Sequence, residues 1–209
     1  MNPFEGLTNA QKNRLFSLLQ VHIYRYNKSQ EILPTIKHEN IICILISGSA
    51  KIIKIDYNGN EIISENLDKD SVFASNISDI SNENCQILAK EFTEVMVIDY
   101  NTFLNSKNFN YSYFNIFFRN IFKIINDKFK YINTRLRILE QKTIRDKLLE
   151  YFDIEYRSNF SKTITLPFSL KNLAEYIGVN RSAMFRELRN LKEERLIEIK
   201  GRKIILIYK

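Results

Sequence analysis

The sequence predicts an α+β fold with three parts in chain order. These are an antiparallel, jelly-roll-like β-roll over residues 1–110, a long helix over residues 111–141, and a helix pair followed by a β-hairpin over residues 142–209. Three observations predict this order. β-Branched runs alternate with turn residues between residues 21 and 99, apolar residues recur at three- and four-residue steps from 111 to 141, and a helix–glycine–helix pattern precedes two short apolar runs.

The first part begins with a short helix and continues as a series of strands. Thr8 is a favourable N-cap for a helix that reaches Gln20. The dipeptide Asn58-Gly59 lies between two β-branched runs and predicts a tight hairpin, because both residues tolerate positive φ. Several strands at this spacing are typical of an antiparallel sandwich or barrel. The expected strands are Ile41–Ile46, Ala50–Ile55, Glu61–Glu65, Cys85–Ala89 and Val95–Ile98.

The middle part predicts one long helix, because residues 111–141 contain no glycine or proline. About 30 residues at 1.5 Å each make a rod of roughly 45 Å. So wide an apolar surface needs more cover than one small sheet supplies. We therefore expect one side to pack on the β-roll and the other on a second copy of the chain; the alternative is a helix buried only against its own domain. The expected dimer contacts are Phe114, Phe118, Ile121, Ile125, Phe129, Ile132, Leu136 and Leu139.

The last part predicts two helices joined by a glycine turn. Apolar residues recur at helical spacing from Leu170 to Ile177, Gly178 ends the first helix, and Asn180 is an N-cap for the second. Arginine side chains on the first two turns of the second helix can reach guanine edges and phosphates in a DNA major groove. The alternative is a solvated face whose arginines pair with nearby glutamates, Glu187 and Glu194. Candidate DNA contacts are Ser169, Asn180, Arg181, Ser182, Arg186 and, towards the phosphate backbone, Arg189.

Two short strands after the helix pair, residues 196–200 and 203–208, predict a wing. Gly201-Arg202 joins them, and glycine at the first central position suits a type II′ turn. Three cations on this hairpin would contact the sugar–phosphate chain and set the register of binding: Lys200, Arg202 and Lys203.

Positive charge is concentrated in this last part of the chain. The net charge is +7, and residues 141–209 hold 15 lysines and arginines against 9 aspartates and glutamates. Residues 1–140 hold 16 against 15. The excess therefore lies where a polyanion would bind, although solubility alone is the other explanation.

The order of β-roll, long helix and winged helix–turn–helix within 209 residues resembles the Crp/Fnr family of bacterial transcription regulators. The resemblance covers almost the whole chain. Its most specific parts are Ile46-Ser47-Gly48-Ser49-Ala50-Lys51 with the Asn58-Gly59 turn, and residues 169–209. It implies a homodimer on an inverted repeat in double-stranded DNA, with half-site centres about 34 Å apart, and makes RNA polymerase a further candidate partner. The positions that match the family's base contacts are Arg181, Ser182 and Arg186.

The resemblance also implies a sensor in the β-roll, but the sequence departs from the cyclic-nucleotide pattern. Members that bind cyclic nucleotides carry a Gly-Glu pair, whose glutamate holds the ribose, and an Arg-Ser pair that holds the cyclic phosphate. Ala74 and Ser75 stand at the first pair, and Glu83 and Asn84 at the second. A carboxylate repels the phosphate that an arginine would attract. We therefore expect no binding of cyclic AMP or cyclic GMP in the usual way.

The sequence offers few residues that could ligate the cofactors of other sensor types. An iron–sulfur cluster needs four cysteines, whereas Cys43 and Cys85 are the only two. His22 and His38 are the only histidines, so we expect neither haem nor a metal ion. Because Cys43 lies inside an apolar run, a buried, inert thiol is expected rather than a redox site. A small organic effector stays open, as does a constitutive regulator whose β-roll is only a dimer scaffold.

The sequence contains no enzyme motif such as G-x-S-x-G, a P-loop or H-E-x-x-H, so we expect no catalytic activity. A module whose winged helix contacts a protein is the alternative to a DNA reader. No charged leader with an apolar run, and no apolar stretch of about 20 residues, is visible. We therefore expect a cytoplasmic protein without membrane contact, and the sequence leaves open whether it activates or represses.

Overall fold

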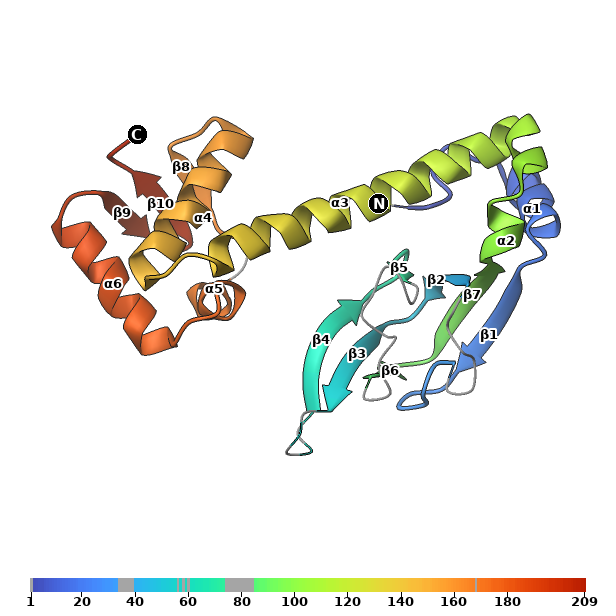
Figure 1. Ribbon diagram of the computed structural model, residues 1–209, viewed down its shortest axis with the longest axis horizontal. Coiled ribbons are helices and arrows are strands. Elements are labelled where there is room, and N and C mark those ends of the chain that lie inside the picture. The colour runs from blue at the N-terminus through green and yellow to red at the C-terminus, as the bar shows by residue number, and fades with distance from the viewer. Residues whose placement is uncertain are drawn as a thin grey trace. The chain divides into compact units, whose positions relative to one another are not determined.

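The computed structural model describes residues 2–33, 40–55, 57, 59, 61–73, 85–167 and 169–209. The chain packs as two compact units, Met1–Asp127 (unit 1) and Lys128–Lys209 (unit 2), whose elements are labelled in Figure 1. The boundary lies within the long helix α3 (Ser112–Leu139). Packing therefore divides the chain inside this helix, whereas the sequence predicts functional boundaries near its two ends, at residues 110 and 141.

Unit 1 contains two antiparallel sheets, with strand orders β1-β7-β2-β5 and β4-β3-β6. The second sheet and the central pair of the first are the strands that the sequence predicts, and β1 and β5 are additional. The bounds are β1 (His22–Tyr26), β2 (Ile41–Ser47), β3 (Ala50–Ile55), β4 (Glu61–Leu67), β5 (Val72–Phe73), β6 (Cys85–Ala89) and β7 (Thr93–Asp99).

Strand β2 is almost continuously apolar because both of its faces are buried. Cys43 and Leu45 belong to the core that the two sheets share. Ile42 and Ile44 point to the opposite face, where they pack with the helices of unit 1. The four-stranded sheet is therefore the middle layer of this unit.

Burial makes Cys43 a poor nucleophile. The side chain is about 1% exposed, and loss of hydration raises the pKa of its thiol to about 12. Almost no thiolate exists at neutral pH, which agrees with the expected inert thiol. Cys85 is partly exposed, and the described residues contain no disulfide.

The helices of unit 1 are α1 (Asn9–Leu18), α2 (Tyr100–Phe103), the 3₁₀ helix η1 (Ser106–Asn110) and the first half of α3. Thr8 caps α1 as predicted: its hydroxyl accepts the Gln11 N–H at 3.3 Å, and the Gln11 side chain accepts the Thr8 N–H at 2.9 Å. The Asn120 amide of α3 donates to the carbonyls of Pro3 (3.1 Å) and Glu5 (2.8 Å). These bonds tie the N-terminal segment to α3.

Unit 2 has one apolar core made by the last turns of α3, three further helices and a small sheet of order β8-β10-β9. Leu148, Phe152, Leu173 and Met184 are among its fully covered side chains. The bounds are α4 (Ile144–Asn159), β8 (Thr163–Thr165), α5 (Leu170–Tyr176), α6 (Arg181–Glu193), β9 (Ile197–Lys200) and β10 (Lys203–Leu206). The predicted helix pair and hairpin are thus confirmed, and β8 extends the hairpin to three strands.

Several predicted positions fall outside the described residues: Asn58 of the expected hairpin turn, His38, and the altered nucleotide pocket at Ala74, Ser75, Glu83 and Asn84. None of the described helices has the length and apolar character that a membrane span requires. Within the same ranges, no group of three or more metal-ligating side chains could hold a metal ion.

Candidate nucleic-acid interface

The turn between α5 and α6 needs a glycine. Gly178 has a φ of +65°, a left-handed conformation that residues with a Cβ rarely adopt. A Cβ at this position would also lie only 2.9 Å from Cδ2 of Leu139, in the last turn of α3. The turn is therefore close-packed against α3, and it fixes where α6 begins.

Both helices of the pair begin with a side-chain cap. The Ser169 hydroxyl accepts the N–H of Asn172 at 3.3 Å. Oδ1 of Asn180 accepts the N–H groups of Ser182 (2.9 Å) and Ala183 (3.2 Å). Ser169 and Asn180 are also expected DNA contacts, and the structure shows that their side-chain oxygens already stabilise the helix starts.

The outer face of α6 carries polar and cationic side chains. Met184, Leu188 and Leu191 are buried in the core of unit 2. Because successive helical residues turn by about 100°, the opposite face holds Ser182, Arg186 and Arg189, all of which are exposed. From the sequence, Arg189 is expected to contact only the DNA backbone or solvent. The helix places it on the same face as the two candidate base contacts, Ser182 and Arg186.

Arg181 occupies a different position from these three residues. It lies at the first turn of α6, about 100° around the helix from Ser182. Its guanidinium carbon lies 5.6 Å from the centre of the Phe185 ring, a cation–π arrangement that restricts the long side chain. Arg181 is nevertheless exposed, so its charge can face a ligand at the N-terminal end of the helix.

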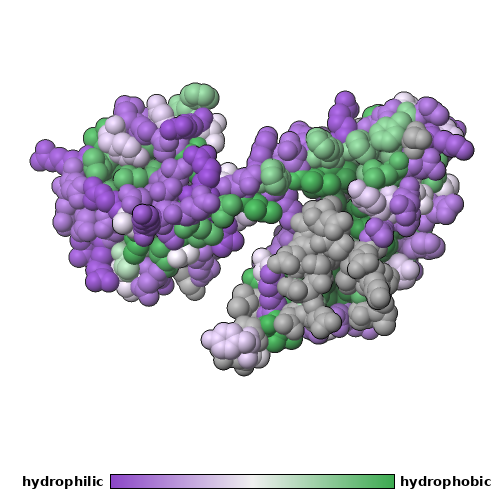
Figure 2. Space-filling model, in the orientation of Figure 1, coloured by the Kyte–Doolittle hydropathy of each residue, from purple (hydrophilic) through white to green (hydrophobic). Residues whose placement is uncertain are grey.

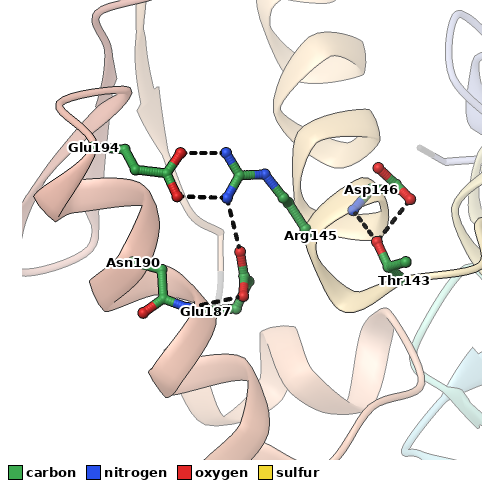
Figure 3. A network of polar contacts seen from close by, with 6 residues as sticks. All are labelled: Thr143, Arg145, Asp146, Glu187, Asn190 and Glu194. Carbon is green, nitrogen blue, oxygen red and sulfur yellow. Dashed lines mark hydrogen bonds and ion pairs between the residues drawn. The ribbon is translucent and has the colours of Figure 1, made fainter.

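Two glutamates of this region, Glu187 and Glu194, are held by Arg145 of α4, as Figure 3 shows. Arg145 forms a bidentate pair with Glu194, with Nη1 2.8 Å from Oε1 and Nη2 contacting Oε2, and Nη1 also lies 3.3 Å from Oε1 of Glu187. Asn190 donates to the other oxygen of Glu187 at 3.1 Å. The hydrogen bond from Arg145 lowers the pKa of Glu194, and hydrogen bonding to Glu194 raises that of Arg145. Arg145 therefore compensates the negative charge of both carboxylates.

This network argues against the alternative in which the α6 arginines pair with Glu187 and Glu194. Glu187 and Glu194 pair with Arg145, 42 and 49 residues away, and not with the arginines on their own helix. In the part of the chain that the structure describes, no ion pair engages Arg181, Arg186 or Arg189. Three cationic side chains on α6 are thus available for an anionic partner.

The wing has the predicted turn. Lys200 lies opposite Lys203, so Gly201 and Arg202 form a two-residue loop. Gly201 has a φ of +61° and Arg202 a negative φ, which is the combination that a type II′ turn requires. Arg202 and Lys203 are exposed at the tip, whereas Lys200 lies 3.4 Å from a carboxylate oxygen of Glu198. Two of the three expected wing cations therefore form no ion pair among the described residues.

The helix pair and the wing match a known domain family. Residues 144–208 match the model of the Crp-like helix-turn-helix domain. The C-terminal unit is a Crp-like helix–turn–helix domain. No curated protein matches the chain by sequence.

Solved structures are similar to this chain over nearly its whole length. The catabolite activator protein of Thermus thermophilus is 16% identical, with a TM-score of 0.53 over 98% of this chain and 92% of that chain. A CooA variant from Carboxydothermus hydrogenoformans is 19% identical, with a TM-score of 0.53 over 97% and 87%. CprK in complex with OCPA is 22% identical, with a TM-score of 0.60 over 92% and 88%.

At these identities the structural likeness establishes the fold of the chain. The domain match identifies residues 144–208 as a Crp-like helix–turn–helix domain. Together they confirm the resemblance that the sequence indicates. The chain has the fold of these proteins and carries a Crp-like helix–turn–helix domain at residues 144–208.

Proposed function

We propose that this protein binds an inverted repeat in DNA as a homodimer, with α6 of each subunit in a major groove. The exposed face formed by Ser182, Arg186 and Arg189 carries the proposal. Its arginines form no ion pair with any described residue, and Arg145 compensates the two glutamates Glu187 and Glu194. Arginine suits the bidentate recognition of guanine. Arg202 and Lys203 of the wing would contact phosphates and set the register.

An exposed apolar stripe on α3 supports the homodimer. Phe122, Phe129, Ile132, Leu136 and Leu139 are between 37% and 62% exposed, and Ile125 is partly exposed. With Phe118, these residues follow one another at alternating four- and three-residue steps, the spacing of a two-stranded coiled-coil contact. Figure 2 shows apolar surface along the middle of α3.

Two of the predicted dimer contacts do not belong to this stripe. Phe114 and Ile121 are 0% and 1% exposed, because they pack in the core of unit 1 with Ile42 and Met96. A side chain that is covered by its own unit offers no surface to a partner. The proposed interface therefore consists of Phe118, Phe122, Ile125, Phe129, Ile132, Leu136 and Leu139.

Two substitutions test the assignment of DNA contacts. Arg181→Ala is expected to cost about 1–3 kcal/mol on the preferred site and to relax one base position, whereas Lys203→Ala should weaken binding to all sequences alike. Fluorescence anisotropy on a selected site and on single-base variants of it measures both effects. Equal weakening by Arg181→Ala on every sequence would make Arg181 a phosphate contact, and a loss by Lys203→Ala on one sequence only would contradict the role of the wing.

We also propose that DNA binding does not depend on cyclic AMP. The support is the sequence, which has Ser75 and Glu83 where a cyclic-nucleotide site has its glutamate and arginine. Calorimetry should detect no binding of cyclic AMP at micromolar concentrations, and DNA affinity should not change when the nucleotide is added. Micromolar binding would overturn this proposal. A constitutive regulator and a sensor of another small effector both agree with it, and a contact with RNA polymerase stays a prediction.

A further inference from the structure

The last turns of α3 present two different faces. Ile138 is fully buried in the core of unit 2, and Tyr131 and Arg135 precede it at four- and three-residue steps, on the same side of the helix. Ile132 and Leu136, on a neighbouring side, are about half exposed and belong to the proposed dimer stripe. One segment of helix therefore holds the DNA-binding unit on one face and offers an apolar surface on another.

The contact between α3 and α5 is centred on the C-terminal end of α5. Nε of Arg135 donates to the carbonyl of Tyr176 at 3.2 Å, and Nζ of Lys147 in α4 donates to the next carbonyl, that of Ile177, at 3.4 Å. The last carbonyls of a helix lack partners within the helix and carry partial negative charge. Two cations from neighbouring helices thus complete the end of α5.

Aromatic contacts strengthen the same junction. The Tyr176 ring lies 5.8 Å from the Tyr131 ring of α3 and 5.8 Å from the Tyr151 ring of α4, measured between centroids. The guanidinium of Arg135 lies 5.9 Å from the centre of the Tyr176 ring. Arg135 therefore contacts Tyr176 through both its backbone carbonyl and its ring, which restricts rotation of α5 about the contact.

The position of this junction links it to DNA recognition. The residues that Arg135 and Lys147 contact stand directly before Gly178, and α6 begins three residues after that glycine. Leu139 of α3 packs against the same turn, at Gly178. These contacts therefore hold the start of α6 at a fixed position relative to the part of α3 that carries Ile132 and Leu136.

We propose that Arg135 is a positioning residue that sets the spacing of half-sites, because it fixes the α5–α6 pair on the helix that joins the two subunits. This inference rests on the proposed function as a dimeric DNA reader. When the DNA-binding unit of each subunit is held in one orientation, the dimer binds both half-sites only if their separation matches the distance between the two α6 helices. Binding of the second half-site then adds affinity without any new kind of contact. Arg135 itself does not contact DNA in this mechanism.

The test uses the whole 209-residue chain and measures its affinity for three kinds of duplex by fluorescence anisotropy. These are the selected inverted repeat, the same repeat with one base pair added or removed between the half-sites, and a duplex with a single half-site. Arg135→Gln removes the charge and shortens the side chain, and Arg135→Lys retains a cationic donor. Lys130→Gln is the matched control, because Lys130 is an exposed cation of the same helix.

Arg135→Gln should lower affinity for the repeat about tenfold, remove the preference among spacings, and leave half-site affinity within about twofold. Arg135→Lys should restore most of the preference, and Lys130→Gln should retain all of it. An equal loss on half-site and repeat would show that Arg135 only stabilises the fold, and an unchanged spacing preference would show that other contacts position the head; either result overturns the inference. Failure of the unsubstituted protein to bind any duplex would overturn the proposed function itself.

Discussion

The double substitution Ile132→Glu and Leu136→Glu is expected to convert the homodimer into a monomer. Both side chains are about half exposed on α3 and lie at neighbouring positions of the stripe. In a two-fold interface, four added carboxylates would face one another in an apolar setting, where an unpaired charge is costly. Because one monomer contacts only one half-site, affinity for the inverted repeat should fall by about 100-fold to 10,000-fold. Sedimentation velocity and anisotropy measure the two effects.

The control for this prediction is Lys130→Glu, which adds negative charge to the same helix outside the stripe. It should leave the protein dimeric. Affinity of the double variant for a single half-site should also be retained, since α6 and the wing are unchanged. A double variant that stays dimeric and binds the repeat normally would show that the subunits associate through another surface.

Local signals in the sequence explain most of the fold. Strands β3 and β6 have the predicted bounds, and Thr8, Thr143 and Ser169 cap the helices that follow them, because β-branched runs and cap residues act over a few neighbours. Strand β1 was not predicted. Four of its five residues, from His22 to Arg25, are exposed, so no alternation of apolar residues marks it. Its structure comes from pairing with β7, about 70 residues later in the chain.

The candidate site was predictable only in part, for the same reason. Ser182 and Arg186 follow from the order of helix, glycine and helix, and the helical period alone would also have placed Arg189 beside them. Arg145 gave no local signal, because its partners Glu187 and Glu194 stand 42 and 49 residues away. Arg135 is likewise separated from Tyr176 by 41 residues. Contacts of this kind depend on how the helices pack, which periodicity does not report.

Arg145→Ala is expected to weaken DNA binding roughly tenfold to 100-fold, although Arg145 lies on α4 and not on the recognition helix. The substitution leaves Glu187 and Glu194 without their main cationic partner, beside the face that would meet phosphates. Uncompensated carboxylates near a polyanion repel it, and like-charge juxtaposition at an interface costs several kcal/mol. Affinity at low and moderate salt, measured by anisotropy, should show the largest loss at low salt, where repulsion is least screened.

Removal of the two carboxylates distinguishes this charge effect from a change in folding. The triple variant Arg145→Ala, Glu187→Gln, Glu194→Gln should regain most of the lost affinity, because the amides carry no charge. Arg157→Ala, which removes another α4 arginine that pairs with Asp153, should change affinity little. If the triple variant binds as weakly as Arg145→Ala, then Arg145 acts by contacting DNA or by holding α6 in place. The role of Arg145 would in that case be direct contact or positioning rather than charge compensation.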